Sequence, residues 1–444
     1  MKRDVFLKVA LVIMATPLIL PLDDIAQTIH LKNWAGNLTY STDKVAYPDS
    51  VGQVQEIVKN SLRIKALGTR HCFNNIADSR YQLLSTSKLN KIISLDREAM
   101  TVTVEAGIKY GELAPWLDAQ GYALHNLASL PHISVGGSIS TATHGSGVRN
   151  KNLSAAVAGL ELVLADGSLL QLTRERSADT LHAVSVGLGA AGIITQVTLD
   201  IEPAYIMRQH VYLKLPMTTL AANFDRVVSA AYSVSLFTDW QSDAINEVWI
   251  KSRTEDALPV PGDEFYGAQP AIRNLHPILA HSAENCTEQL GVAGPWYERL
   301  PHFKMGFTPS SGAELQSEYF IPHTHAVEAI QAIHRLGNQI GPYLLISEIR
   351  TIAADELWMS PCYHQDSVTI HFTWKPDWEG VQSVLPLIEK ALAPFQPRPH
   401  WGKVFILEPV VLQSRYEKLD DFKKLIAGYD PERKFQNDFL ARNL

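Results

Sequence analysis

The spacing of apolar positions near the start of the chain predicts helices and strands in alternation. In Val51–Lys59 apolar side chains recur every three or four residues, which is typical of an amphipathic helix. The short apolar run Ile64–Leu67 predicts a strand, and Gly68 ends it. Tyr110–Gln120 has helical spacing again and is followed by a stop at Gly121. The pattern favours a β-α-β opening.

Two pairs of segments show the two-residue alternation of β-hairpins. Ile92–Asp96 and Thr101–Glu105 form the first pair, in which the valines of the second strand share the buried face. Leu160–Leu164 and Leu169–Thr173 form the second pair, around an Asp-Gly turn at 166–167. The order of elements is therefore α+β rather than a strict βαβ repeat.

From about Ala204 to Pro397 the pattern changes to longer amphipathic segments and aromatic strands, such as Glu247–Ile250 and His371–Trp374. This change predicts a second, separate α+β domain. The length agrees, because 444 residues exceed what one hydrophobic core usually serves.

Composition narrows the class of protein. Hydrophobic residues make up 46% of the chain and charged residues 19%, which is typical of a folded globular protein. Lys and Arg number 39 against 46 Asp and Glu, a net charge of −7, so nucleic acid is not an expected partner. Cys72, Cys286 and Cys362 lie far apart, which predicts neither a disulfide framework nor a structural zinc site.

The N-terminal residues have the pattern of a signal peptide. A basic start at Lys2 and Arg3 precedes the 14-residue apolar run Val9–Leu22, which is shorter than the roughly 20 residues needed to cross a bilayer. The start resembles a degenerate twin-arginine export signal. Export to the periplasm is one interpretation. A retained anchor associated with the membrane is a second, and a plain extension of a cytoplasmic protein is a third.

The segment Gly187–Gly192 satisfies GxGxxG, the pattern of a Rossmann dinucleotide site. That site requires a helix after the glycines, whereas Ile193–Asp200 is rich in β-branched residues and predicts a strand. A Rossmann site is therefore not favoured. Two interpretations remain: glycines that permit a tight turn, or bare backbone that lies along a cofactor and its phosphates.

Three other segments combine glycines with small polar residues: Gly68–Asn74, Ser129–Ser138 and Thr141–Gly147. Loops of this kind can offer backbone N–H groups to a diphosphate at close range. Each is a weak signal alone, but their order along the chain is specific.

In this order the segments resemble the FAD-binding domain of the vanillyl-alcohol oxidase superfamily, and within it the alditol oxidases, which oxidise xylitol and sorbitol. The resemblance runs from about Asn33 to the C-terminus. It is carried by Asn33–Asn37, the loop of His71, Ala128–Ser138, Thr141–Gly147 and His400–Lys403.

The resemblance implies an α+β fold with a two-part FAD-binding domain of the vanillyl-alcohol oxidase type and an inserted α+β substrate domain. We expect a signal-like extension over 1–32 and the first FAD-binding part over 33–205. The substrate domain would follow over 206–398, and 399–444 would complete the FAD-binding domain.

The resemblance also implies FAD held covalently by His71. A neutral imidazole nitrogen is nucleophilic enough to join the 8α-methyl group of the flavin. Some relatives add a cysteinyl link where Leu130 stands here, so a single covalent bond is expected. Cys72 would point away from His71 in an extended segment and serve packing. The expected cofactor-binding residues are Gly68, Thr69, Arg70, His71, Cys72, Phe73, Ser129, Ser134, Gly137, Thr141, Thr143, His144, Gly192, Ile194 and His400.

For the substrate, strand alternation within Ser347–Arg350 places Glu348 and Arg350 on one face. A surface ion pair is the usual alternative for such a spacing. By the resemblance, Glu348, Arg350 and Lys403 are catalytic. The expected substrate-binding residues are Ser129, Glu348, Arg350, Thr373 and Lys403.

The implied reaction is oxidation of the terminal hydroxyl of an alditol by hydride transfer to flavin N5, with oxygen as the acceptor and hydrogen peroxide as product. The alternative is an aldonolactone oxidase or dehydrogenase acting on D-arabinono-1,4-lactone or L-gulono-1,4-lactone. No metal is expected, although His323 and His325 form an HxH pair. The sequence leaves open the preferred substrate, the electron acceptor and the oligomeric state.

Overall fold

The computed structural model describes residues 30–256, 264–306 and 314–444. Within this part of the chain, Leu31–Leu444 forms one compact unit. The apolar run expected to act as an export signal lies outside the described residues. Across those that are described, we find no helix with both the length and the apolar character to cross a membrane.

A small parallel sheet opens the unit. Strands β1 (Val45–Ala46) and β2 (Lys65–Leu67) both pair with β3 (Leu83–Ser85), and helix α1 (Val51–Asn60) connects the first two. Val54 and Val58 are the buried residues of α1, as its apolar spacing requires. The predicted helix and strand are confirmed.

A five-stranded antiparallel sheet follows, and it contains both predicted hairpins. In spatial order its strands are β4 (Ile92–Asp96), β5 (Thr101–Glu105), β9 (Ile193–Asp200), β7 (Val157–Val163) and β8 (Leu169–Thr173). Val102 and Val104 are fully buried, as predicted for β5.

Helices and short strands lie between the strands of this sheet along the chain or follow its last strand. Leu113 and Leu117 of the predicted helix lie in the core beside the valines of β5. The connecting elements are α2 (Tyr110–Ala119), β6 (Tyr122–Ala123), α3 (Val135–Ile139), α4 (Arg174–Ser185) and β10 (Glu202–Pro203).

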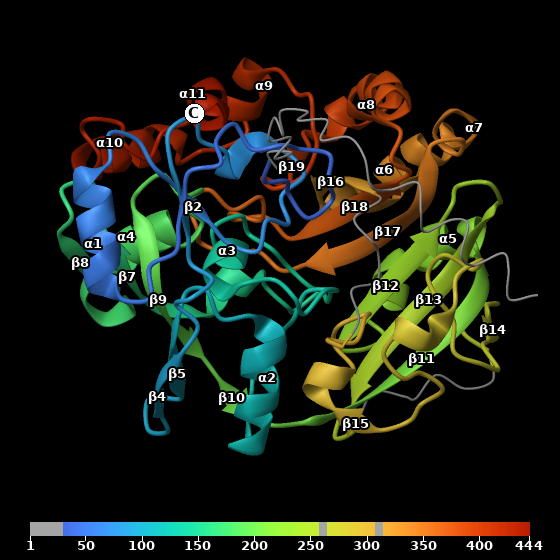
Figure 1. Cartoon of the computed structure of the whole chain (residues 1–444). Coiled ribbons are helices and arrows are strands. Elements are labelled where there is room, and N and C mark those ends of the chain that lie inside the picture. Colours follow the sequence, from blue (N-terminus) through green and yellow to red (C-terminus); the bar gives the residue numbers. More distant parts are fainter. Residues whose placement is uncertain (1–29, 257–263, 307–313) are drawn as a thin grey trace, which may run out of the picture. The chain divides into compact units, whose positions relative to one another are not determined.

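The next half of the chain builds a larger sheet of nine strands, which we call the large sheet (Figure 1). Its main strands, in spatial order, are β11 (Ile206–Pro216), β13 (Ala244–Arg253), β12 (Ser233–Thr238), β17 (Leu344–Ile352), β18 (Ser367–Trp374), β16 (Leu315–Pro322) and β19 (Arg398–Pro399). At one edge β14 (Gln269–Pro270) and β15 (Gly294–Pro295) both pair with β11.

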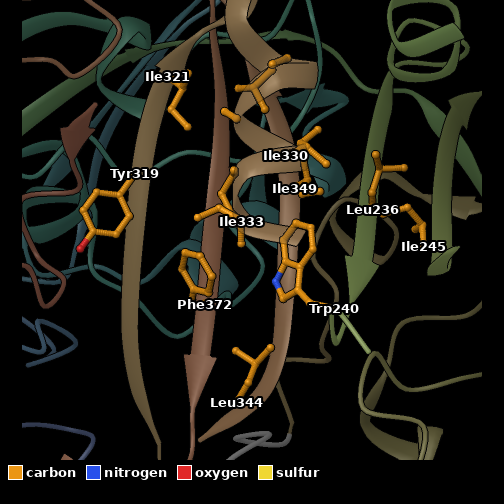
Figure 2. Close-up of a cluster of buried hydrophobic side chains, with 14 of the residues drawn as sticks. Leu236, Trp240, Ile245, Tyr319, Ile321, Ile330, Ile333, Leu344, Ile349 and Phe372 are labelled. Carbon is orange, nitrogen blue, oxygen red and sulfur yellow. The ribbon is translucent and has the colours of Figure 1, made fainter. Parts of the chain in front are cut away.

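Helices cover one face of the large sheet. Apolar side chains of α5 (Met217–Val228), α6 (Ala326–His334) and α8 (Trp378–Leu392) share one buried cluster with side chains of the sheet. Figure 2 shows part of this cluster, in which Ile330 and Ile333 of α6 lie over the sheet beside Ile349 and Phe372. The short helix α7 (Gly337–Ile340) follows α6.

The C-terminal segment returns to the N-terminal half of the unit. A buried cluster brings Trp401, Phe422 and Leu440 together with Ala142 and Leu188. The segment contains α9 (Pro409–Gln413), α10 (Leu419–Tyr429) and α11 (Asp438–Asn443). This contact is what the two-part arrangement requires, and the boundaries at 205 and 398 stay predictions.

Candidate active site

The face of the large sheet away from the helices lines a cavity of about 470 Å³. The opposite wall comes from the loop at 68–73, the loop at 128–144 and the turn after α4. His400, Gly402 and Lys403 of the C-terminal segment also reach it. Segments far apart in the sequence therefore meet at one place.

Every residue predicted to bind substrate lines this cavity, and so does every predicted cofactor-binding residue except Ser134. Ser134 lies directly behind the wall: a Cβ atom on Gly68 or Gly137 would stand 2.8 or 2.9 Å from its Oγ atom. The two glycines are needed so that the backbone can approach that hydroxyl.

The loop of His71 is sharply bent. Arg70 has φ +64° and donates through Nη1 to the carbonyl of Lys32 at 2.9 Å. Trp34 stacks on the His71 ring with centroids 5.0 Å apart, and His71 Nδ1 lies 3.1 Å from Thr69 Oγ1. Burial lowers the pKa of His71 to about 4, so the imidazole is neutral at physiological pH.

Cys72 follows His71 directly and was expected to point away from it and to serve packing. Arg70, just before the two residues, is left-handed, and both residues line the cavity. The sulfur packs against Gly402, where a Cβ would stand 3.2 Å from it. Burial raises the pKa of the thiol to about 12, so Cys72 is an inert neutral group here.

The glycine motif belongs to a helix-turn-strand unit, the reverse of the Rossmann order. Helix α4, which was not predicted, precedes it, and the predicted strand β9 follows. Gly189 has φ +62° and lines the cavity, as does Gly192. A Cβ on Gly187 would stand 2.6 Å from the Val184 carbonyl oxygen. Turn geometry and close packing thus account for the three glycines, and two of them also expose backbone to the cavity.

Strand register brings the charged side chains together. Residues paired across neighbouring strands share a face, and Phe237, Glu348, His371 and Glu318 form one such row across β12, β17, β18 and β16. Arg350 lies two residues beyond Glu348 on the same face, as the alternation predicted. Glu348 and Arg350 are each only 5% exposed, so they do not form a surface ion pair.

Glu318 lies at the centre of this charge cluster. It accepts hydrogen bonds from Arg350 at 2.8 Å and from Lys403 at 2.5 Å, and its Oε1 is 3.3 Å from His144 Nε2. Burial alone would raise the pKa of Glu318, but Lys403, His144 and Arg350 hold it well below the usual value. The carboxylate is therefore ionised and holds both cations in place.

The remaining predicted substrate residues are connected to the same cluster. Arg350 Nη1 lies 3.5 Å from Ser129 Oγ, and Arg350 Nε lies 3.5 Å from Glu348 Oε2. Lys403 Nζ contacts His371 Nδ1 at 2.8 Å, and His371 Nε2 contacts the Thr373 hydroxyl at 3.0 Å. The cavity thus presents two cations, a second carboxylate and two hydroxyls within one network.

Sequence reasoning missed three members of this site: Glu318, His302 and Lys251. Glu318 stands among the apolar residues of β16, where a lone charged residue on a buried strand is the one available signal. His302 contacts Glu348 from a loop, and Lys251 contacts His302 from β13. Neither has a motif, because the contacts arise from tertiary packing.

The cavity also fits a flavin nucleotide by its own chemistry. His71 lines the cavity, and its buried Nε2 atom has no hydrogen-bond partner among the described residues. The surrounding wall is glycine-rich backbone and small hydroxyl residues, which leaves room for a planar ring system and a diphosphate.

Comparison with known proteins agrees with this arrangement. The FAD binding domain family matches residues 42–173, and the D-arabinono-1,4-lactone oxidase family matches residues 312–443. A cholesterol oxidase from B. sterolicum has the same fold, with a TM-score of 0.75 at 14% identity over 94% of this chain and 96% of that one.

Fold, cavity and matching families together define an FAD-dependent oxidoreductase of the vanillyl-alcohol oxidase type. An alditol oxidase from Streptomyces sp. is 46% identical over 92% of this chain and 97% of its own length. An L-gulono-1,4-lactone dehydrogenase from Mycobacterium tuberculosis is 27% identical over 93% of this chain and 98% of its own. The chain belongs to the alditol oxidase family.

In the described residues no group of three or more His, Cys, Asp or Glu side chains is arranged to hold a metal ion. The HxH pair is engaged elsewhere: His323 Nε2 lies 2.8 Å from Asp225 Oδ1.

Proposed function

We propose that this protein oxidises the terminal hydroxyl of an alditol such as xylitol or sorbitol, with FAD as the hydride acceptor and oxygen as the final oxidant. The observation that carries the proposal is the convergence of Ser129, Glu348, Arg350, Thr373 and Lys403 on the same cavity as the loop of His71. The identity to an alditol oxidase over nearly the whole chain supports it.

The charge cluster suits the chemistry of an alcohol. FAD, when bound, accepts the hydride that leaves the alcohol carbon. The hydroxyl must lose its proton as well, and Arg350 and Lys403 would favour the alkoxide because they are fixed, water-poor cations. Burial lowers the pKa of Lys403, although Glu318 opposes the shift, so Lys403 gives up a proton more readily than a solvated lysine.

The two carboxylates have different parts in substrate binding. Glu318 is occupied by Arg350 and Lys403, whereas Glu348 accepts from His302 and faces the cavity. An ionised carboxylate accepts hydrogen bonds only, and a guanidinium donates only. Glu348 and Arg350 side by side therefore match a chain of hydroxyl groups, each of which donates and accepts.

The same proposal includes covalent attachment of FAD to a ring nitrogen of His71. The imidazole is neutral, half-buried and held between Trp34 and Thr69. A neutral, oriented nitrogen is the nucleophile that the bond to the 8α-methyl carbon requires.

A lactone substrate is the second candidate, because the family that matches residues 312–443 is named for D-arabinono-1,4-lactone oxidase. The L-gulono-1,4-lactone dehydrogenase relative supports it at lower identity. We place it second because the alditol oxidase is far more similar over the same span.

The test is a substrate panel on the purified protein. Xylitol, sorbitol, L-gulono-1,4-lactone and D-arabinono-1,4-lactone are each supplied, and two readouts are taken: peroxide release in air, and reduction of an artificial electron acceptor without oxygen. Faster turnover of the polyols in air is expected; turnover of the lactones alone would overturn the proposal.

Attachment of FAD is tested separately after acid precipitation. The yellow colour is expected to stay with the protein and to be lost from His71→Ala. An equally yellow precipitate from His71→Ala would contradict the covalent bond.

A further inference from the structure

A second lysine–histidine pair joins the cavity: His302 lines it, and Lys251 lies behind His302. In the first pair, Lys403 contacts His371, which contacts Thr373. In the second, Lys251 Nζ contacts His302 Nδ1 at 3.0 Å, and His302 Nε2 contacts Glu348 Oε1 at 2.8 Å. Both pairs end on a side chain that lines the cavity, so each histidine connects a buried lysine to a substrate-facing group.

The contacts of Lys251 determine which atoms carry protons. Its Nζ atom lies 2.5 Å from the Leu300 carbonyl oxygen, 3.1 Å from the Pro301 carbonyl oxygen and 3.0 Å from His302 Nδ1. The two carbonyls only accept, and an ammonium group has three protons to donate. The third proton therefore goes to His302 Nδ1, which must be the unprotonated ring nitrogen.

The tautomer of His302 then follows. Because Nδ1 is unprotonated, the ring proton of the neutral imidazole is on Nε2, which donates it to Glu348 Oε1. Burial, together with Lys251, lowers the pKa of His302 to about 4, so the ring stays neutral. Phe237 and Trp249 hold its plane edge-on, with ring centroids 5.4 and 5.1 Å away.

We propose that Lys251 and His302 are positioning residues for substrate: Lys251 fixes the Nε2–H tautomer of His302, and His302 holds Glu348 as an oriented carboxylate acceptor for a substrate hydroxyl. The assignment of that hydroxyl to a polyol rests on the proposed function; the tautomer and the orientation of Glu348 do not.

Glu348 has the geometry that this role requires. Its Oε1 is taken by His302, while Oε2 is 3.5 Å from Arg350 Nε, which is beyond a good hydrogen bond. Arg350 Nε and Glu348 Oε2 therefore leave hydrogen-bonding capacity for a hydroxyl. Without the hydrogen bond from His302, the Glu348 carboxylate could rotate so that both oxygens face Arg350. The hydrogen-bonding position for a substrate hydroxyl would then be lost.

The first test needs no substrate. Protein labelled with ¹⁵N in its histidines is examined by NMR at pH 6, below the value of about 7 to which burial lowers the pKa of Lys251. The His302 signals are assigned by their loss in His302→Gln. The expected result is that His302 carries its proton on Nε2 and that its Nδ1 is unprotonated. A proton on Nδ1, or an imidazolium, would overturn the proposal.

The second test compares three variants by xylitol affinity, read from the change in flavin absorbance on titration, and by kcat and KM. His302→Leu and Lys251→Met are expected to weaken binding and raise KM roughly 10-fold, with a smaller effect on kcat, because an oriented charge-assisted hydrogen bond is lost. His302→Gln can accept from Lys251 and donate to Glu348, so it is expected to recover most of the affinity.

A general loss of packing would give a different pattern. Lys434→Met is the matched control, because Lys434 is also a buried lysine that donates to a backbone carbonyl, that of Val58 at 2.8 Å, outside the cavity. It should lower the unfolding temperature without changing xylitol affinity. Equal weakening in His302→Gln and His302→Leu, or wild-type affinity in His302→Leu, would overturn the proposal. If wild-type protein binds no polyol, the proposed function fails while the NMR result still decides the tautomer.

Discussion

The two faces of the large sheet are built by the same strands and are both largely buried, yet they differ completely in chemistry. Ile349 and Glu348 are sequence neighbours with exposures of 1% and 5%. On the helix face Ile349, Phe372 and Tyr319 join an apolar cluster (Figure 2). On the cavity face their neighbours Glu348, His371 and Glu318 form a row of ionisable groups.

The difference shows what allows charge to be buried. A lone ionised group loses several kcal/mol on leaving water, and only well-placed partners offset that cost. On the cavity face Arg350 contacts two carboxylates and Glu318 contacts two cations, so each charge has a partner from another strand or loop. The helix face needs no such pairing, because its stability comes from packing.

The largest effect is expected from Glu318→Gln. The amide keeps the shape but removes the charge that holds Arg350 and Lys403, which should lower kcat/KM for xylitol roughly 10³-fold. Peroxide assays measure it. Tyr319→Phe, the next residue on the opposite face, is the control and should retain activity within a few-fold. A wild-type kcat/KM in Glu318→Gln would show that the charge of Glu318 is not needed for activity and would contradict this prediction.

The corresponding substitution on the helix face is Phe372→Ala. Loss of a fully buried ring should lower the free energy of unfolding by about 4 kcal/mol, since a cavity remains. Urea denaturation measures it, and protein that is still folded should keep near-normal kcat/KM for xylitol. A loss below about 1 kcal/mol would show that this face can repack freely.

Lys65 is a buried lysine that, among the described residues, is held by backbone carbonyls rather than by a salt bridge to a carboxylate. Lys65 donates to the carbonyls of Leu188, Gly189 and Phe435, and burial lowers its pKa to about 7 from 10.5. Between these values the unfolded chain binds the additional proton, so the free energy of unfolding rises with pH.

From pH 7 to 9 this contribution is about 2 kcal/mol, and Lys65→Met should remove it. Denaturant titrations at pH 7, 8 and 9 on both proteins measure the slopes. An unchanged slope in Lys65→Met would assign the pH dependence to another group.

The smallest effect is expected from Ile349→Val. Removing one methylene from the helix face should cost about 1 kcal/mol of stability and leave the catalytic constants unchanged, although Glu348 and Arg350 flank the site. Thermal unfolding measures the stability change, and steady-state kinetics measure kcat and KM. A changed KM would show that the helix face transmits packing changes to the cavity.

Local pattern was enough to predict much of the fold. The hairpins at 92–105 and 160–173 and the helix at 110–119 follow from alternation, periodicity and turn residues alone. The same alternation correctly placed Glu348 and Arg350 on one face. These features depend on neighbours within a few residues, which the sequence displays directly.

The missed features depend on distant partners. Glu318 acquires its role from register with His371 and from Lys403, more than eighty residues away. Arg70 adopts a left-handed conformation that glycine usually takes, so no turn signal in the sequence marks the bend in the loop of His71.

The contribution of the C-terminal segment to the cavity has a consequence for biosynthesis. A nascent chain that has reached only residue 395 possesses the loop of His71 and the whole row from Phe237 to Glu318, but not Lys403, which Glu318 binds, or the Phe435 carbonyl that Lys65 needs. Until those residues leave the ribosome, Glu318 and Lys65 are charges without these partners. The cavity and its supporting contacts can therefore be completed only after synthesis has passed residue 435.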